Sequence, residues 1–181
     1  GDLYIRNTTD DKDIIFQSDN GTGSVTTYFS LDGSLADGTY FYTKWPDNSI
    51  IALGSSNDLV LWHDGNNSYI RQVGTGDLYI ENTTDDKDII FRCDDSSGSI
   101  EEYFRLDGSA NTDGNPRTKF PDNSRLIFGA GDDMEIYHDG TDNHIEATST
   151  LNIGTANSGV AINIGHTTSE TTINDNLTVT G

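Results

Sequence analysis

Hydrophobic residues stand along this chain in short runs, separated by clusters rich in Gly, Asp, Asn and Ser. The runs follow one another at roughly nine to twelve residues, a spacing typical of short strands joined by turns. No stretch carries the i, i+3, i+4, i+7 pattern of an amphipathic helix, and Gly recurs too often to allow one. The pattern predicts an all-β chain with almost no helix. In the first part of the chain, the predicted strand runs are 3–5, 14–16, 25–31, 40–42, 50–53, 59–62 and 69–70.

Apolar and polar residues alternate along some of these segments, most clearly at 134–137 and 151–153. Alternation in a strand places the apolar side chains on one face of the sheet and the polar side chains on the other. Each strand then presents only a few apolar side chains inward. At ~25 cal/mol per Å² of buried apolar surface, this burial does not offset the ordering entropy of so many loop residues. We therefore expect the sheets to bury their apolar faces against a partner surface.

The sequence repeats itself along its length. Residues 1–16 and 76–91 differ only at Arg6 and Glu81, so residue n of the first copy corresponds to residue n + 75 of the second. The correspondence continues without a gap to a Trp-His-Asp-Gly in the first copy and a Tyr-His-Asp-Gly in the second. Recurrence of one supersecondary unit predicts an elongated array rather than a globule. Because Gly1 falls inside the repeating pattern, we expect the chain to be part of a longer protein.

The repeat divides the chain into three segments. The first β repeat covers residues 1–75, the second covers 76–150, and 151–181 begin as a degenerate third copy. From Leu151 onward the alternation is tighter, Gly closes each rung, and aromatic residues are absent. This pattern predicts a slim β stem, built as a β-solenoid or a triangular β-prism.

Charge and cysteine content exclude several classes of function. The net charge of -20, from 30 acidic and 10 basic residues, would repel phosphate backbones and anionic lipid headgroups. We therefore expect no nucleic-acid binding and no membrane insertion, and the chain lacks the apolar run of ~18 residues that a membrane helix needs. Cys93 is the only cysteine, so an intrachain disulfide is excluded and stability must come from another source.

A His beside a carboxylate occurs once in each copy, as His63-Asp64 and His138-Asp139. This pairing is found in general bases and in metal sites. Each pair, however, stands between the end of a predicted strand and a Gly, where a hairpin turn belongs, and no nucleophile accompanies it. The interpretation we favour is a structural turn. The alternative is a metal site, in which a trimer axis would gather the His63 side chains of three copies around a transition metal.

The segment Gly-Ala-Gly-Asp-Asp-Met-Glu-Ile at 129–136 partly matches the calcium-binding nonapeptide of β-rolls. A β-roll repeats this motif in succession, whereas here it occurs once per copy, so calcium binding is an alternative only. We assign no catalytic, cofactor-binding or metal-binding residue to the chain. The residues kept as candidate metal ligands are His63, His138, Asp132 and Asp133.

Three motifs together carry a resemblance to a known family. They are Asp-Leu/Met-x-Leu/Ile-Trp/Tyr-His-Asp-Gly at 58–65 and 133–140, Tyr-Phe-x-Leu-Asp-Gly at 28–33 and 103–108, and the closing Asn-Leu-Thr-Val-Thr-Gly. As a set they resemble the repeats of tail fibres and related virion structural proteins of tailed phages, especially marine and cyanophage-type ones. The resemblance implies a fibre in which three identical chains wind together, so that each strand closes a seam supplied by its neighbours.

We therefore expect a structural segment of a homotrimeric virion tail fibre that supports host-cell attachment. Its expected location is the virion surface or another extracellular site, and we do not expect an enzyme. Two alternatives remain, a glycan-binding repeat of a bacterial surface adhesin and a capsule-degrading tailspike. For a binding role, the segment that differs most between the copies, 35–42 against 110–117, is the expected contact with a host glycan or protein.

Overall fold

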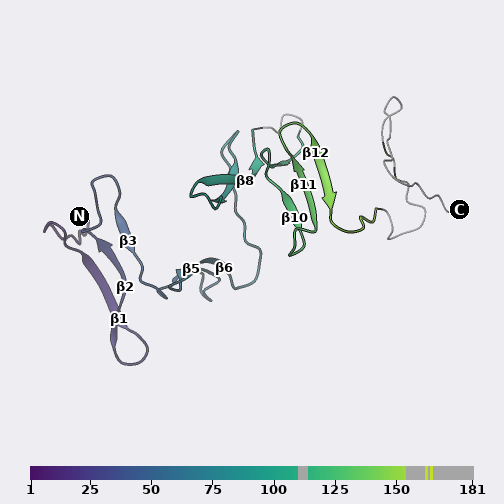
Figure 1. Ribbon diagram of the computed structural model, residues 1–181. Helices are drawn as coiled ribbons and strands as arrows, with labels where there is room; N and C mark the ends of the chain where they lie inside the picture. The colour runs from purple at the N-terminus through teal and green to yellow at the C-terminus, as the bar shows by residue number, and fades with distance from the viewer. Residues whose placement is uncertain (110–113, 154–161, 163, 165–181) are drawn as a thin grey trace. The chain divides into compact units, whose positions relative to one another are not determined.

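The computed structural model describes residues 1–109, 114–153, 162 and 164, whose course is drawn in Figure 1. These residues form antiparallel sheets and contain no helix, so the predicted all-β class is confirmed for this part of the chain. Accordingly, the described residues include no helix long and apolar enough to cross a membrane. Most of the predicted solenoid or prism stem, residues 154–161, 163 and 165–181, lies outside the described residues.

The chain divides into two units, Gly1–Ile80 and Glu81–Gly181. The first unit contains two three-stranded sheets, and in each sheet the strands pair in the order in which they follow one another along the chain. The first sheet consists of β1 (Ile14–Asp19), β2 (Val25–Asp32) and β3 (Tyr42–Lys44). The second sheet consists of β4 (Ile51–Leu53), β5 (Leu59–His63) and β6 (Ser68–Gln72).

The second unit repeats this arrangement strand by strand. Its first sheet consists of β7 (Ile89–Asp94), β8 (Ile100–Asp107) and β9 (Arg117–Lys119). Its second sheet consists of β10 (Leu126–Phe128), β11 (Met134–His138) and β12 (Asn143–Ala147). Every strand begins and ends 75 residues after its counterpart in the first unit. Each copy of the sequence repeat therefore folds into two antiparallel meanders.

Two of the predicted strand segments, 3–5 and 151–153, are wrong, because neither forms a strand. Residues 3–5 belong to no strand, and neither do the matching residues 78–80 of the second copy. Leu3 has 87% of its surface exposed. A strand is defined by the hydrogen bonds that it makes with a neighbour, and no described strand pairs with either segment. The apolar run alone does not make a strand here.

The loop that precedes β1 is fastened to the end of β2. Asn7 Oδ1 accepts a hydrogen bond from the Thr9 N–H at 3.1 Å, and Asn7 Nδ2 donates to the Asp13 carbonyl at 3.1 Å. Asp13 Oδ1 in turn accepts the Gly33 N–H at 2.9 Å. Gly33 approaches Lys12 so closely that a Cβ at this position would lie 2.6 Å from the Lys12 carbonyl oxygen. These contacts explain why this loop and the Leu-Asp-Gly-Ser motif recur together in both copies.

The Pro-Asp-Asn-Ser turn joins the two sheets of the first unit. The Ser49 hydroxyl donates to the Tyr28 carbonyl of β2 at 2.5 Å, and the Asn48 N–H donates to the His63 carbonyl at the end of β5 at 2.8 Å. Asn48 has a φ of 63°, a left-handed conformation that Asn adopts more readily than most residues. The same bonds recur in the second unit, from Ser124 to Tyr103 and from Asn123 to His138.

Stacked aromatic rings cross the first sheet of each unit. Phe16 stacks on Phe29 with ring centroids 4.4 Å apart, and Phe29 stacks on Trp45 at 4.9 Å. A β-bulge between Phe16 and Gln17 shifts the pairing register next to this stack. The second unit carries the corresponding stack of Phe91, Phe104 and Phe120. Such rings add about 0.5–1.5 kcal/mol per pair beyond the area that they bury.

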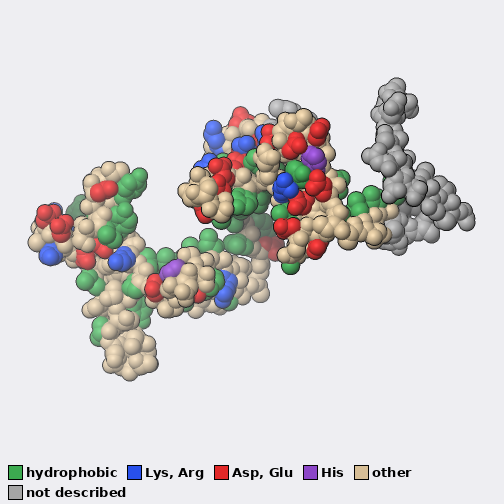
Figure 2. Space-filling view, in the orientation of Figure 1, with side chains coloured by type: hydrophobic (Ala, Val, Ile, Leu, Met, Phe, Trp, Pro, Cys, Tyr) green, Lys and Arg blue, Asp and Glu red, His purple; other side chains and the backbone are tan. Residues whose placement is uncertain are grey.

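Apolar burial is otherwise small. Among the described residues, Val60 is the one hydrophobic side chain that is buried, with 8% of its surface exposed. The other buried residues are polar: Ser30, Asp32 and Asp107. Figure 2 shows hydrophobic side chains on the visible surface of both units. Each sheet therefore carries apolar side chains that no other described part of its own unit covers and that are exposed to solvent.

We expect Gly33→Ala to destabilise the first unit by about 1–3 kcal/mol, because the added methyl group would overlap the Lys12 carbonyl. Urea unfolding followed by tryptophan fluorescence would measure the loss, since both tryptophans, Trp45 and Trp62, lie in this unit. The control is Gly131→Ala, where the added carbon meets only the Asp133 carboxylate, at 3.5 Å. The urea unfolding transition of this control, followed by circular dichroism, should have the same midpoint as that of the parent chain. An unchanged transition in Gly33→Ala would contradict the close approach.

Candidate functional site

The His-Asp-Gly motif forms the turn that joins β5 to β6. Asp64 Oδ1 accepts the N–H groups of Asn66 and Asn67 at 2.9 and 2.8 Å, and Gly65 has a φ of 97°. Asp64 Oδ2 accepts the Tyr69 hydroxyl at 2.8 Å. A short Asp side chain that bonds to backbone N–H groups further along the chain stabilises a tight turn. The carboxylate is thus occupied by the turn itself.

The second unit builds the same turn between β11 and β12. Asp139 Oδ1 accepts the N–H groups of Thr141 and Asp142, both at 2.8 Å, and Asp139 Oδ2 lies 3.0 Å from His144 Nε2. The N–H groups of Asp142 and Thr141, followed by the imidazole of His144, lower the pKa of Asp139 from 3.8 to about 2. The same kind of contact, led by the Asn67 N–H, lowers the pKa of Asp64.

The two histidines of these motifs have different neighbours. His63 Nδ1 lies 3.0 Å from the Ser68 hydroxyl, across β5 and β6. His138 Nε2 lies 3.9 Å from Asp122 Oδ1. Within the described parts of the chain, no three His, Cys, Asp or Glu side chains come together as metal ligands would. A metal site made from the His63 side chains of three chains stays a prediction, because it would need residues from more than one chain.

Asp132 and Asp133, the candidate calcium ligands, lie in the turn between β10 and β11. Asp132 has a φ of 53°. The Asp133 N–H donates to the Phe128 carbonyl at 2.9 Å, and the Asp133 carbonyl accepts the Thr148 N–H at 2.9 Å. The Asp133 side chain packs against Gly129, where a Cβ would overlap its carboxylate. The Asp133 backbone therefore links the end of β10 to the residue that follows β12. Calcium binding at this turn stays a prediction.

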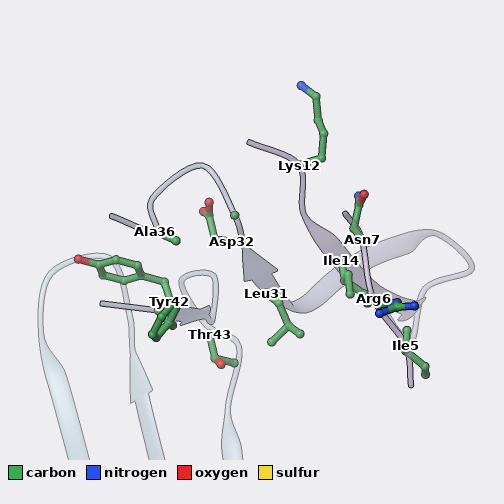
Figure 3. A pocket seen from close by; sticks show the side chains of 12 residues that line it. Ile5, Arg6, Asn7, Lys12, Ile14, Leu31, Asp32, Ala36, Tyr42 and Thr43 are labelled. Atoms are coloured by element: carbon green, nitrogen blue, oxygen red, sulfur yellow. The ribbon is translucent and has the colours of Figure 1, made fainter. Parts of the chain in front are cut away.

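A pocket lies along the first sheet of the first unit, and Figure 3 shows its lining from close by. Ile14 of β1 and Leu31 of β2 form its apolar floor, Tyr42 of β3 lies on one side, and Arg6 of the N-terminal segment lies on the other. Lys12 points away from Leu31. An aromatic ring, a guanidinium and an apolar floor together suit a small polar ligand with an apolar face.

The pocket changes between the two units. Its floor is retained in the second unit, but Phe41 and Tyr42 are replaced by Pro116 and Arg117. The sequence predicted that the variable segment 35–42 would be the contact for a ligand. It did not predict the second wall, because Arg6 directly follows the run 3–5, which was expected to be a strand. The retained floor residues are Ile89 and Leu106.

Each second sheet carries a cation over stacked rings. In the first unit, Trp62 stacks on Tyr69 at 4.3 Å, and the Arg71 guanidinium lies 4.7 Å from the centroid of the Trp62 ring. In the second unit, Arg125 lies 4.0 Å from the ring centroid of Tyr137. The two arginines are not equivalent positions of the repeat. Sequence comparison of the copies could not detect this cluster, because the cation comes from a different strand end in each unit.

Comparison with known proteins adds no assignment to this geometry. No family model, no curated protein and no solved structure matches the chain. The function must therefore be inferred from the residues, turns and surfaces described above.

We expect the Asp139 carboxyl to titrate at about 2, well below 3.8, when its ¹³Cγ shift is followed by NMR. Because folding lowers this pKa, the ionised carboxylate stabilises the fold above about pH 3.8, and this stabilisation is lost as the pH falls towards 2. His144→Tyr, which restores the residue found at position 69, should keep the pKa below 3.8, since the two N–H donors remain. A pKa of 3.8 for Asp139 in the folded protein would contradict the hydrogen bonds that its carboxylate accepts in this turn.

Proposed function

We propose that the chain is a structural segment of a trimeric virion tail fibre that supports host-cell attachment. The observation that carries this proposal is the small apolar burial within each unit: Val60 is the one hydrophobic side chain buried among the described residues. A three-stranded sheet with one uncovered apolar face is at the lower limit of independent stability. Association of several copies supplies the missing burial.

The repetition of one unit supports a role in spanning distance. Each copy brings its own turns, aromatic stack and link between sheets, so copies can be added without redesign of their neighbours. The residues that recur most closely, such as the loop at 7–13 and the Pro-Asp-Asn-Ser turn, bond to backbone groups of their own copy. A fibre needs this property, because its length depends on the number of copies and not on a single core.

The number of chains and the virion location come from the resemblance to phage tail fibres. Three identical chains, each offering the same faces, can cover those faces and the edges of the sheets at once. The acidic surface, with a net charge of -20, favours solubility of a long assembly and disfavours attraction to phosphate backbones. Both properties suit a phage attachment fibre, which is exposed to solvent outside the cell.

A second candidate, a glycan-binding adhesin repeat, is favoured by the pocket along β1 to β3. Phe41 has 81% of its surface exposed and lines this pocket together with Tyr42 and Arg6. An exposed aromatic ring beside a guanidinium suits the apolar face and the hydroxyl groups of a sugar. The change of the pocket wall in the second unit would give the two copies different ligands.

Light scattering should give a mass of about three times the 19.7 kDa of one chain, with or without EDTA. Sedimentation velocity on the same sample should show the high frictional ratio of an elongated particle. A monomer would contradict the trimeric fibre and leave a single-chain adhesin. A trimer that dissociates in EDTA would instead support the metal site at His63 of three copies.

For the adhesin, binding to immobilised bacterial glycans should be lost in Phe41→Ala, because the exposed ring would no longer cover the sugar. Pro116→Ala, at the equivalent position of the second unit, is the matched control and should bind as the parent chain does. Absence of glycan binding by the parent chain, in an assembly of confirmed mass, would remove the adhesin and leave the structural segment.

A further inference from the structure

One face of the second sheet of the first unit carries five aliphatic side chains, with His63, Ser68 and Gln72 at its two ends. Ile51, Leu61 and Ile70 are direct cross-strand partners, and Leu53 pairs with Leu59. Residues that pair directly, or that stand two apart in a strand, share a face of the sheet. Nothing in the unit covers this face fully: Leu53 is 53% exposed and Ile70 is 64% exposed.

The second unit has the same face at the same positions. Leu126, Ile136 and Ile145 are cross-strand partners, and Phe128 pairs with Met134. Four of the five positions hold a different residue from the first unit, yet all five stay apolar. Phe128 and Ile145 are 47% and 63% exposed. We call these two sets of five residues, in β4–β6 and in β10–β12, the aliphatic faces; Phe128 is their one aromatic member, and His138 and Asn143 lie at the end of the second face.

The opposite face of the same sheets has not kept its character. Val60 and Arg71 of the first unit correspond to Glu135 and Glu146 of the second. This face is also covered in part from within the unit. Val60 is buried there in the first unit, and in the second unit Arg125 pairs with Glu135. The comparison of the two copies therefore identifies one face that must stay apolar and one that may carry charge.

We infer that the aliphatic faces are the contact surface between copies of this chain. This inference rests on the proposed assembly of several chains and names the surface that they use. Two chains that each carry a net charge of -20 repel each other, and the aliphatic faces hold none of that charge at their ten positions. Contact through them brings apolar side chains together without desolvating an ionised group.

The area of one aliphatic face explains why the repeat is needed. Three strands, each up to five residues long, cover roughly 14 by 17 Å, or about 240 Å². A stable specific interface buries about 800 Å² on each partner. One sheet is therefore too small, and the contact must be made again by each following copy. Several weak contacts along one chain then act together, as linked binding modules do.

Cysteine labelling tests this surface with adjacent residues that point to opposite faces. In a Cys93→Ser background, which places at this position the residue found in the first copy, Ile70→Cys should react with a maleimide at least about tenfold more slowly than Arg71→Cys in the assembled protein. Ile145→Cys and Glu146→Cys form the same pair in the second unit. In urea, all four thiols should react at similar rates.

The mass of each variant separates failure of this inference from failure of the proposed function. Equal labelling rates in a sample that light scattering shows to be a trimer would overturn the aliphatic-face contact and leave the trimer. Equal rates in a monomer would overturn both. A charge placed on the face, Ile70→Asp, should weaken association at least ~100-fold, whereas Arg71→Glu, which copies the charge of the second unit, should not. Unchanged association in Ile70→Asp would also overturn the contact.

Discussion

A three-stranded sheet has two faces and two edges, and this chain builds four such sheets whose described residues include one buried hydrophobic side chain. The other stabilising interactions of the structure compensate for this small apolar burial. Rings are stacked across the strands, where a small area gives the most stabilisation. Loops are fastened by side chains instead of by a core. The apolar side chains that remain uncovered form the surfaces through which we propose that chains associate.

The abundance of Asp follows from the same constraint. Asp13, Asp32, Asp64 and Asp139 each accept backbone N–H groups at a turn. An ionised carboxylate makes such bonds stronger than a neutral acceptor would. These N–H groups are the main cause of the lowered pKa of Asp64 and Asp139, whereas at Asp32 the Ser34 hydroxyl is the main cause, followed by the Leu35 N–H. Turns are thereby ordered without apolar volume. The strongly acidic character of the chain is thus partly a by-product of how it fixes its loops.

The sequence predicted the class of fold and most strand positions, because short apolar runs between Gly and Asp clusters leave few alternatives. It failed where a strand depends on a partner: Leu3–Ile5 has the composition of a strand but no neighbour to pair with. It also missed contacts that depend on register, such as the stack of Phe16 on Phe29 beside a bulge. The pocket wall at Arg6 and the two arginine clusters depend on tertiary placement, which periodicity does not encode.

The meander order of the strands has a consequence for synthesis on the ribosome. Every described strand pairs only with the strand before or after it, so each sheet contains all of its own hydrogen-bond partners within a short stretch of chain. Loop-closure entropy is then low, and hairpins of this kind form in about 1–10 μs, far faster than residues are added. Each copy can acquire its strand pairing as it emerges, before the next copy with its near-identical loop is available as a wrong partner. The order of translation thus protects the register of a chain whose copies resemble one another closely enough to exchange strands.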